Sequence, residues 1–281
     1  MQRLIPLFAV LFAIPLHAQS RGAVERFNVP ENADSWSVYD FAAADFFFPE
    51  FFVGTDDPDL NSIYWLFDGD NGFSFSSLGA SGGAFAGDLA AQRASGVSFW
   101  IEVEDASVVD YVEVSFYSVT MGRYYYSETV GPENGWQEVT FNFSDRWFIW
   151  DGTQYVETPI TGNILSDVDE FVVGCVPVST AADGTYVGLD DFTVVPELIV
   201  PTLDPVLAGG RIQFSFEEWD AQTYVAQSAT TGFGAADWSN QPGALFRSGG
   251  NLVLNQPTTG SKRFWRVDTE LEFTDVPDLI P

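Results

Sequence analysis

The sequence predicts an all-β protein, and three features of the chain support this fold class. Aromatic and β-branched residues alternate with polar residues in many short runs, which is the pattern of strands with one buried face. Clusters of Gly, Pro, Asn and Asp separate these runs and are typical of turns. No long segment repeats apolar residues at the spacing of an amphipathic helix. Many short strands with such turns favour sandwiches or barrels.

The individual strands follow from this alternation, taken in order along the chain. The clearest case is GVSFWIEVED, residues 96–105, where every second side chain from Val97 is apolar and points to one face. Trp100 and Glu102 then lie on the opposite, polar face. The segments VVDYVEVSFYS and GWQEVTFNF alternate in the same way. The predicted strands are 36–41, 63–67, 73–77, 97–104, 109–119, 124–130, 136–143, 170–177, 186–195, 211–217, 222–228, 252–255 and 263–268.

The first residues of the chain are predicted to be an export signal, MQRLIPLFAVLFAIPLHA, residues 1–18. Arg3 supplies the positive end, an apolar run follows, and Ala18 is the small residue before the cut. The apolar run is too short to span a bilayer. We therefore expect the mature protein to be secreted or held at the cell surface, without insertion into a membrane.

Two folded domains are expected after the signal. Pro residues interrupt the segment VVPELIVPTLDPVLAGG, and Pro cannot donate a hydrogen bond to a strand ladder. This segment predicts a boundary between a first domain over residues 25–197 and a smaller β-sandwich over residues 200–270. The remaining residues, 271–281, are short, acidic and rich in Pro, and are predicted to be a frayed tail.

The charge and the residue composition exclude several classes of function. The chain has 11 basic and 40 acidic residues, a formal charge of −29, which repels nucleic acid and anionic lipid. Such a surface suits calcium, neutral glycans or solubility in a salty medium. The one histidine, His17, lies in the export signal, so the mature chain lacks the imidazole of nucleophile triads and of His-ligated zinc. The one cysteine, Cys175, lies in an apolar run and is predicted to be a buried structural thiol.

The order of features from residue 87 to residue 197 resembles the galactose-binding-like jelly roll of many non-catalytic carbohydrate-binding modules. In that family a GW-x-x-V-T strand follows a pair of sheet strands, and an LDD sequence lies in the last strand. The resemblance implies a jelly-roll first domain that binds carbohydrate. The matching segments are GVSFWIEVED, VVDYVEVSFYS, YYYSETVGPENGWQEVTFNFSD, ILSDVDEFVVGC and YVGLDDFTVV.

The same resemblance implies a structural calcium ion near the first and last strands. The last-strand positions that match are Asp190 and Asp191, and one of them must point toward the packed face if the strand is regular. A buried carboxylate without a cation or hydrogen-bond donors costs several kcal/mol, so Ca²⁺ or a dense set of hydrogen bonds is expected there. The ligands near the first strand stay open among Glu31, Asp34, Asp40 and Asp45.

The second predicted domain resembles a small β-sandwich found at the C-termini of exported bacterial proteins. Its strand TYVAQSAT precedes a loop that ends in Trp238, and the aromatic-Arg strand from Phe264 to Val267 closes the module. The resemblance implies no activity, so a spacer or attachment module is the expectation.

Two aromatic clusters are candidate binding sites. If the strands 97–104, 109–119 and 136–143 lie in one sheet, their polar residues share one face, where flat rings mixed with hydrogen-bonding groups suit a sugar. Alternatively, the N-terminal segment rich in Phe packs over that face. The second cluster lies in the segments 124–126 and 146–155, from which Trp150 and Tyr155 are the predicted contacts. The residues predicted to share the sheet face are Trp100, Glu102, Tyr111, Glu113, Tyr117 and Asn142.

These observations predict an exported, non-catalytic protein that stacks a polysaccharide or a surface glycan on exposed aromatic residues. The alternative is a structural or adhesive protein of the cell surface or matrix, which has no small ligand. A third hypothesis is a glycosidase or lyase that uses carboxylates alone, for which Glu102 and Glu113 could face each other across two strands.

Overall fold

A computed structural model of the chain describes residues 23–53, 61–77, 83–179, 182–198, 204–208, 211–217, 222–229, 238–241, 244–248, 251–257, 264–271 and 274–275. The predicted export signal lies outside the described residues, and so do residues 276–281 of the predicted tail. No helix within these described ranges has the length and the apolar character needed to cross a membrane.

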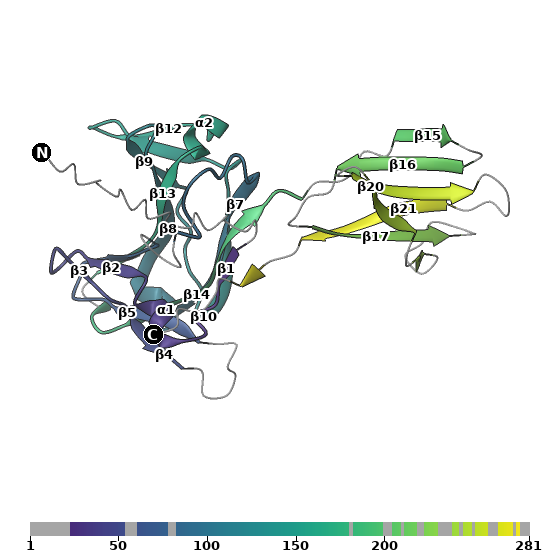
Figure 1. The fold of residues 1–281 in the computed structure, drawn as a ribbon. Coiled ribbons are helices and arrows are strands. Elements are labelled where there is room, and N and C mark those ends of the chain that lie inside the picture. The colour runs from purple at the N-terminus through teal and green to yellow at the C-terminus, as the bar shows by residue number, and fades with distance from the viewer. Residues whose placement is uncertain are drawn as a thin grey trace, which may run out of the picture.

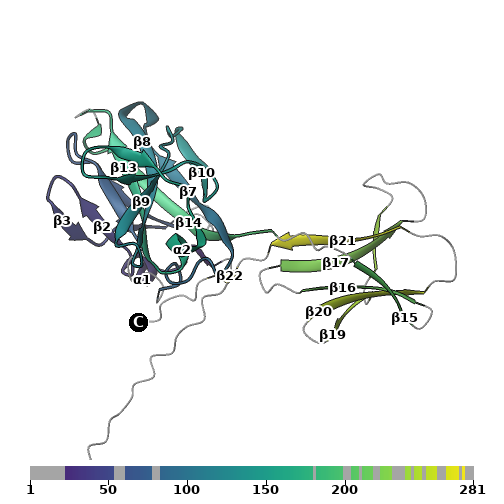
Figure 2. The ribbon, with the colours of Figure 1, turned by 90° about the horizontal axis from the view of Figure 1, so that it is seen from above.

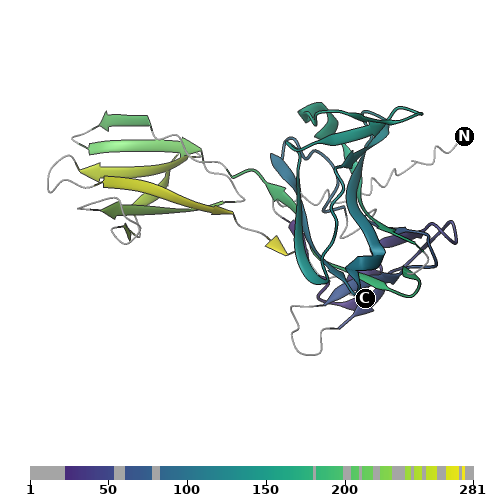
Figure 3. The ribbon, with the colours of Figure 1, turned by 180° about the vertical axis from the view of Figure 1, so that it is seen from behind.

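The protein is all-β, as the alternation predicts, and its described helices are single turns (Figure 1). The strands up to Pro196 form two large sheets that face each other as the layers of a β-sandwich (Figure 3). The helical turns are α1 (Pro30–Ala33), α2 (Gly162–Leu165) and the 3-10 turn η3 (Ala106–Val108).

The first sheet, called sheet A, has the strand order β10-β7-β14-β1-β22, with β5 beside β14 and β4 beside β5. All of its described pairs are antiparallel except β1 with β22. Its strands are β1 (Ala23–Glu25), β4 (Glu50–Phe52), β5 (Ser62–Leu66), β7 (Ala94–Val103), β10 (Gly135–Asn142), β14 (Tyr186–Pro196) and β22 (Thr274–Asp275).

The second sheet, called sheet B, has the strand order β12-β11-β9-β8-β13-β6-β2-β3, and its pairs are antiparallel. Its strands are β2 (Ser37–Asp40), β3 (Asp45–Phe47), β6 (Phe73–Ser76), β8 (Val109–Ser118), β9 (Arg123–Ser127), β11 (Trp147–Trp150), β12 (Tyr155–Glu157) and β13 (Val168–Pro177).

The core fills the space between sheets A and B with the inward side chains of both. Phe192 of β14 contacts Phe99 of sheet A at 6.0 Å and Phe171 of sheet B at 5.8 Å between ring centroids. Trp36 packs edge-on against Phe192 at 5.2 Å. The Cys175 thiol is buried in the same core, as predicted, and burial raises its pKa.

A β-bulge in β14 changes the expected positions of its two aspartates. Asp190 pairs with Trp100 and Thr193 pairs with Ser98, so Asp191 and Phe192 together oppose one residue of β7. Asp191 has a left-handed φ of 49°, which Asp tolerates better than most residues. Because of this extra residue, Phe192 enters the core and neither aspartate does. The expectation that one carboxylate points into the packed face held only for a regular strand, and the bulge removes that condition. Asp190 is nevertheless buried, on the face of the strand that also carries Trp100.

The prediction that three strands share one sheet is also wrong. β7 and β10 pair in sheet A, whereas β8 lies in sheet B between β9 and β13. Trp100, Glu102 and Asn142 are therefore in the opposite layer from Tyr111, Glu113 and Tyr117. Alternation along a strand shows which side chains share a face of that strand, but not which sheet the strand joins.

Two smaller antiparallel sheets follow, of orders β15-β16-β20-β19 and β18-β17-β21 (Figure 2). The chain then returns to sheet A, where β22 lies parallel to β1 within the tail that was expected to fray. The strands of the smaller sheets are β15 (Asp204–Ala208), β16 (Arg211–Glu217), β17 (Gln222–Ala229), β18 (Ser239–Asn240), β19 (Leu245–Ser248), β20 (Asn251–Pro257) and β21 (Phe264–Leu271).

Candidate functional site

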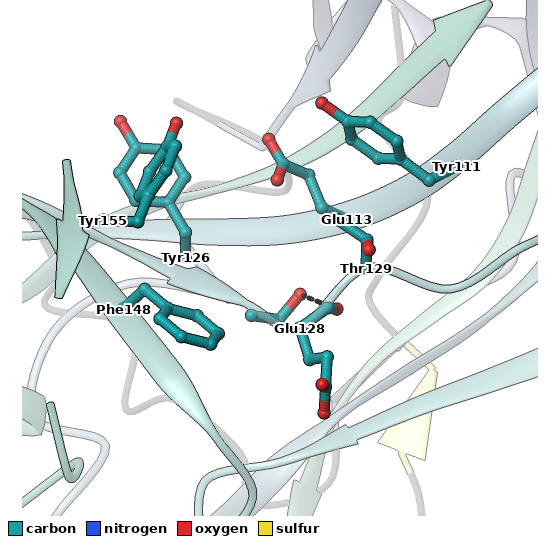
Figure 4. A pocket seen from close by; sticks show the side chains of 8 residues that line it. Tyr111, Glu113, Tyr126, Glu128, Thr129, Phe148 and Tyr155 are labelled. Carbon is teal, nitrogen blue, oxygen red and sulfur yellow. Dashed lines mark hydrogen bonds between the residues drawn. The ribbon is translucent and has the colours of Figure 1, made fainter. Parts of the chain in front are cut away.

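The outer face of sheet B carries a cleft with a volume of about 350 Å³ (Figure 4). It lies over β8, β9, β11 and β12, which are neighbours in the sheet. Aromatic rings and carboxylates make most of its wall. The residues that line it are Tyr111, Glu113, Tyr126, Ser127, Glu128, Thr129, Phe148 and Tyr155.

These side chains point away from the core because successive residues of a strand face opposite sides of the sheet. In β8, Val112 and Val114 are buried in the core, so Tyr111 and Glu113 face outward. In β9, the neighbours of buried Tyr125 face outward for the same reason. The cleft therefore results from a period of two in strands whose inner faces are fixed by the core.

Three aromatic rings meet at one end of the cleft. Tyr155 packs edge-on against Tyr126 at 5.3 Å and against Trp150 at 5.2 Å between ring centroids. Tyr155 is 55% exposed and Trp150 is 52% exposed, so both rings keep a free surface. Phe148, one strand away from Tyr126 and in register with it, extends this wall.

Glu113 is the carboxylate at the centre of the cleft, and glycine makes room for it. Gly174 of β13 pairs with Glu113, and a Cβ atom at Gly174 would lie 3.2 Å from Cγ of Glu113. Burial raises the pKa of Glu113 above its usual range. No group in the part of the chain that the structure describes donates a hydrogen bond to this carboxylate. A half-buried acceptor of this kind favours a ligand that brings its own donors.

The positive charge beside the cleft is already paired. Arg146 lies 3.0 Å from Oε1 of Glu128 and 3.1 Å from Oε2 of Glu157, and its guanidinium stands over the Phe148 ring at 5.3 Å. Figure 4 shows the Glu128 carboxylate pointing away from Glu113. The cleft therefore presents one central carboxylate rather than two that converge.

Tyr117 lies on the same outer face as the cleft, although it does not line it. Its ring contacts Tyr124 at 5.0 Å, and the Tyr124 hydroxyl donates a hydrogen bond to Glu170. Burial and this hydrogen bond raise the pKa of Tyr124. Ser76 donates a second hydrogen bond to Glu170, at 2.5 Å. Tyr124 also contacts Tyr126 at 6.3 Å, so a row of tyrosines continues from Tyr117 into the cleft.

The remaining predicted residues, Trp100 and Glu102, lie on the outer face of sheet A. Trp100 is 39% exposed, so the Phe-rich N-terminal segment does not cover it as the alternative required. That segment instead forms the edge strands β3 and β4, where Phe46 and Phe52 are themselves exposed. The structure thus brings together Tyr111, Glu113, Trp150 and Tyr155 of the predicted residues, and separates them from Trp100 and Glu102.

Two cleft residues, Tyr126 and Phe148, were not singled out from the sequence. Both lie in the aromatic segments 124–126 and 146–155, of which only 124–126 was among the predicted strands. β9 confirms the predicted strand and β11 adds one over Trp147–Trp150; Tyr125 and Trp147 are buried in them and their neighbours face outward. The same alternation that located β7 applies to them and would have found both residues.

Asp190 and Asp191 lie at the bulge, away from the cleft. Asp190 is buried, and burial, Asp191 and Glu25 raise its pKa to about 8. Asp191 lies 3.4 Å from Nε of Arg26. Within the described ranges, no group of three or more His, Cys, Asp or Glu side chains could hold a metal ion. Calcium binding by these two residues stays a prediction.

Among solved structures, the chain is similar to a family 11 carbohydrate-binding module of the cellulosomal cellulase Lic26A-Cel5E of Clostridium thermocellum. The identity is 13% and the TM-score 0.40, over 59% of this chain and 89% of that chain. The L4b domain of human laminin alpha-2 has 10% identity and a TM-score of 0.40, over 60% of this chain and 96% of that one. A beta-1,2-glucanase from Parabacteroides distasonis has 10% identity and a TM-score of 0.31, over 85% of this chain and 36% of that one.

No protein-family model matches the chain, and no curated protein does. These three structures are a carbohydrate-binding module, a laminin domain and a beta-1,2-glucanase. At this level of likeness none of them transfers a function to the chain, so the function has to be argued from the side chains of the cleft.

Proposed function

We propose that the mature protein is exported and binds a neutral or weakly charged glycan in the sheet B cleft, without catalysing a reaction. The single observation that carries the proposal is the combination of open rings at Tyr155 and Trp150 with a Glu113 carboxylate that has no donor within the described chain. A sugar ring has an apolar C–H face, which stacks on an aromatic ring, and a rim of hydroxyl groups, which donate hydrogen bonds.

The charges of the cleft support a ligand without negative charge. Glu113 and Glu128 line the cleft and are acidic, and Arg146 beside it is held between Glu128 and Glu157. An anionic glycan would meet these carboxylates with no free cation within the described part of the cleft. A neutral glycan instead offers Glu113 the hydroxyl donors that the described chain does not.

The geometry supports binding over catalysis. Hydrolysis by carboxylates needs an acid and a second carboxylate on either side of the scissile bond. Glu113 and Glu128 both line the cleft, but Glu128 points away and pairs with Arg146 (Figure 4). Glu102, the other predicted partner of Glu113, lies on the opposite sheet.

Removing rings from the cleft tests the proposed function. Tyr126→Ala and Tyr155→Ala are each expected to weaken binding about tenfold, because each removes a stacking surface worth about 1 kcal/mol or more. Glu113→Gln should weaken binding less, because the amide keeps one acceptor. Pull-down with a panel of insoluble neutral polysaccharides, then titration with the one retained, measures the effect. Phe246→Ala, which removes an exposed ring from β19, is the matched control.

Binding that is unchanged in both tyrosine variants would show that the cleft is not the site. Retention on none of the polysaccharides would instead favour the structural or adhesive alternative. Release of reducing ends from a retained polysaccharide would contradict the non-catalytic part of the proposal.

Export is tested separately from binding. Expression of the full chain in a secreting bacterial host is expected to place the protein outside the cytoplasm, with a mature chain that begins after Ala18. Mass spectrometry of the intact protein measures this cut. A protein that keeps residues 1–18 and stays in the cytoplasm would show that the predicted signal is not one.

A further inference from the structure

The outer face of sheet A carries a second aromatic strip, which the cleft does not include. Trp136 of β10, Glu102 of β7 and Gly188 of β14 lie opposite one another in register, and Tyr64 of β5 follows Gly188. These residues belong to four neighbouring strands, so the strip crosses the sheet. Trp100 lies two residues before Glu102 on the same face of β7.

Contacts within the strip hold its rings in place. The end of the Trp136 indole lies 3.4 Å from the position that a Cβ atom of Gly188 would occupy, so this glycine lets the indole lie low across the sheet. Burial raises the pKa of Glu102, and the neighbouring Tyr186 side chain acts against that rise. Tyr186 also packs edge-on against Tyr64, at 6.3 Å between ring centroids. The rings are thus ordered by the sheet rather than left as isolated exposed side chains.

Acidic side chains flank the rings of the strip, of which Glu138 is exposed and Asp190 is buried. Trp100 lies between Glu138 of β10 and Asp190 of β14 in register. Arg26, whose charge acts on Asp190, lies 3.4 Å from Asp191. The strip therefore sets Trp100 beside the Glu138 carboxylate and Trp136 beside the Glu102 carboxylate.

We propose that the sheet A strip is a second glycan-binding surface, so that one protein molecule bridges two glycan chains. This inference rests on the proposed function of the cleft, because the strip repeats its chemistry of open rings beside carboxylates. Sheets A and B are the two layers of one sandwich, and their outer faces point in opposite directions (Figure 3). Two glycans bound on these faces cannot be one short chain, so the protein acts as a cross-link.

A glycan fits the strip better than a protein partner does. The side chains around Trp100 and Trp136 on this face are polar: Ser98, Thr140 and Glu138 stand beside them in register on β7 and β10. A protein interface core instead concentrates apolar side chains and excludes charge. The exposed phenylalanines of β3 and β4 are a separate surface at the sheet edges.

Calorimetric titration of the full chain with a hexasaccharide of the retained polysaccharide tests this bridge. The unaltered protein is expected to bind two molecules. The double variant Trp100→Ala/Trp136→Ala should bind one hexasaccharide molecule, and so should the double variant Tyr126→Ala/Tyr155→Ala. The protein with all four substitutions should bind none. Trp100→Ala alone, which removes an exposed ring, is expected to weaken one of the two sites at least fivefold and guards against misfolding of the double variant.

Light scattering gives an independent measure, because a two-sided binder cross-links a long soluble glycan and a one-sided binder does not. If the protein binds one hexasaccharide molecule and loses it only in the Tyr126 and Tyr155 variants, the proposal of a second surface is wrong and the cleft remains the binding site. Two bound molecules unaffected by those tyrosines would overturn the cleft and keep the strip. Binding of polylysine, and not of the hexasaccharide, to the sheet A face would also overturn the inference.

Discussion

Replacing Asp190 by asparagine is expected to stabilise the protein at alkaline pH and to flatten the dependence of its stability on pH. Burial, Asp191 and Glu25 raise the pKa of Asp190 from 3.8 to about 8 in the folded protein. Because the folded state keeps the proton more tightly than the unfolded state, the stability from this group is complete below about pH 4. It is lost as the pH rises through about 8.

The size of the effect follows from the shift in pKa. A rise from 3.8 to about 8 corresponds to at most about 6 kcal/mol of stability lost between acidic and alkaline pH. The asparagine amide in Asp190→Asn stays neutral, and its oxygen can still accept the 2.7 Å hydrogen bond from the Asp191 backbone N–H. Urea unfolding at pH 5 and pH 9 in the presence of EDTA measures the difference. Equal pH dependence in the variant and the unaltered protein would contradict the prediction.

Asp191→Asn is the matched control. Asp191 is one of the charges that raise the pKa of Asp190, but the larger cause is burial, which this substitution leaves in place. We therefore expect a smaller change in the pH dependence than in Asp190→Asn. A larger change would show that the repulsion between the two carboxylates dominates over burial.

The predicted calcium ion would give the same carboxylates a different partner and the opposite pH dependence. Ca²⁺ binds ionised carboxylates, so calcium bound at Asp190 and Asp191 should stabilise the protein most at alkaline pH, where Asp190 loses its proton. The melting temperature in Ca²⁺ should then exceed that in EDTA at pH 9, and the difference should vanish in Asp190→Asn. An equal melting temperature with Ca²⁺ and with EDTA would show that the calcium prediction is wrong.

Local alternation explains which parts of the fold could be predicted. The faces of β7 follow from the period of two, with Val97 and Phe99 buried and Trp100 exposed. The sheet to which β8 belongs depends on contacts between distant segments, which a local pattern does not contain. The bulge at Asp191 is another such case, because one extra residue reverses the faces that a regular strand would have.

For the candidate site too, local alternation predicts which residues face outward, but not which strands bring them together. Tyr111, Glu113 and Tyr155 were predicted from composition and alternation, and they meet because β8, β9, β11 and β12 are neighbours in sheet B. The prediction that Tyr111 and Glu113 share a face with Trp100 failed because it placed β7 and β8 in the same sheet. The room for Glu113 comes from Gly174, a residue of β13 that is 61 positions away in the sequence and pairs with it across the ladder. No pattern along one strand shows such a pair.

Trp147→Ala is expected to lower both the stability of the protein and its binding of glycan. Trp150, three residues later, is exposed and serves as the comparison, because its ring does not support the core. Trp147 is buried, packs against Phe116 at 5.3 Å and Phe143 at 5.7 Å, and its indole N–H donates a 2.9 Å hydrogen bond to the carbonyl of Asn142. Truncation of such a core side chain costs about 3–5 kcal/mol of unfolding free energy. It also releases β11, which places Phe148 in the wall of the cleft and Trp150 against Tyr155.

Trp150→Ala is the matched variant, since this ring is exposed and contacts Tyr155. It should change the free energy of unfolding by less than about 0.5 kcal/mol and weaken binding of the retained polysaccharide about tenfold. Trp147→Phe keeps a buried ring but loses the hydrogen bond to Asn142, so it should recover most of the stability and the binding. Denaturant unfolding and calorimetry on the same samples measure both quantities.

The outcomes of this pair distinguish a residue that positions a strand from one that meets the ligand. If Trp147→Ala folds stably and still binds, β11 is held by its pairing with β9 and β12 alone. If Trp150→Ala binds as the unaltered protein does, the stacking surface ends at Tyr155. Because stability and binding fall together in one variant and separate in the other, a general loss of fold cannot produce both expected results.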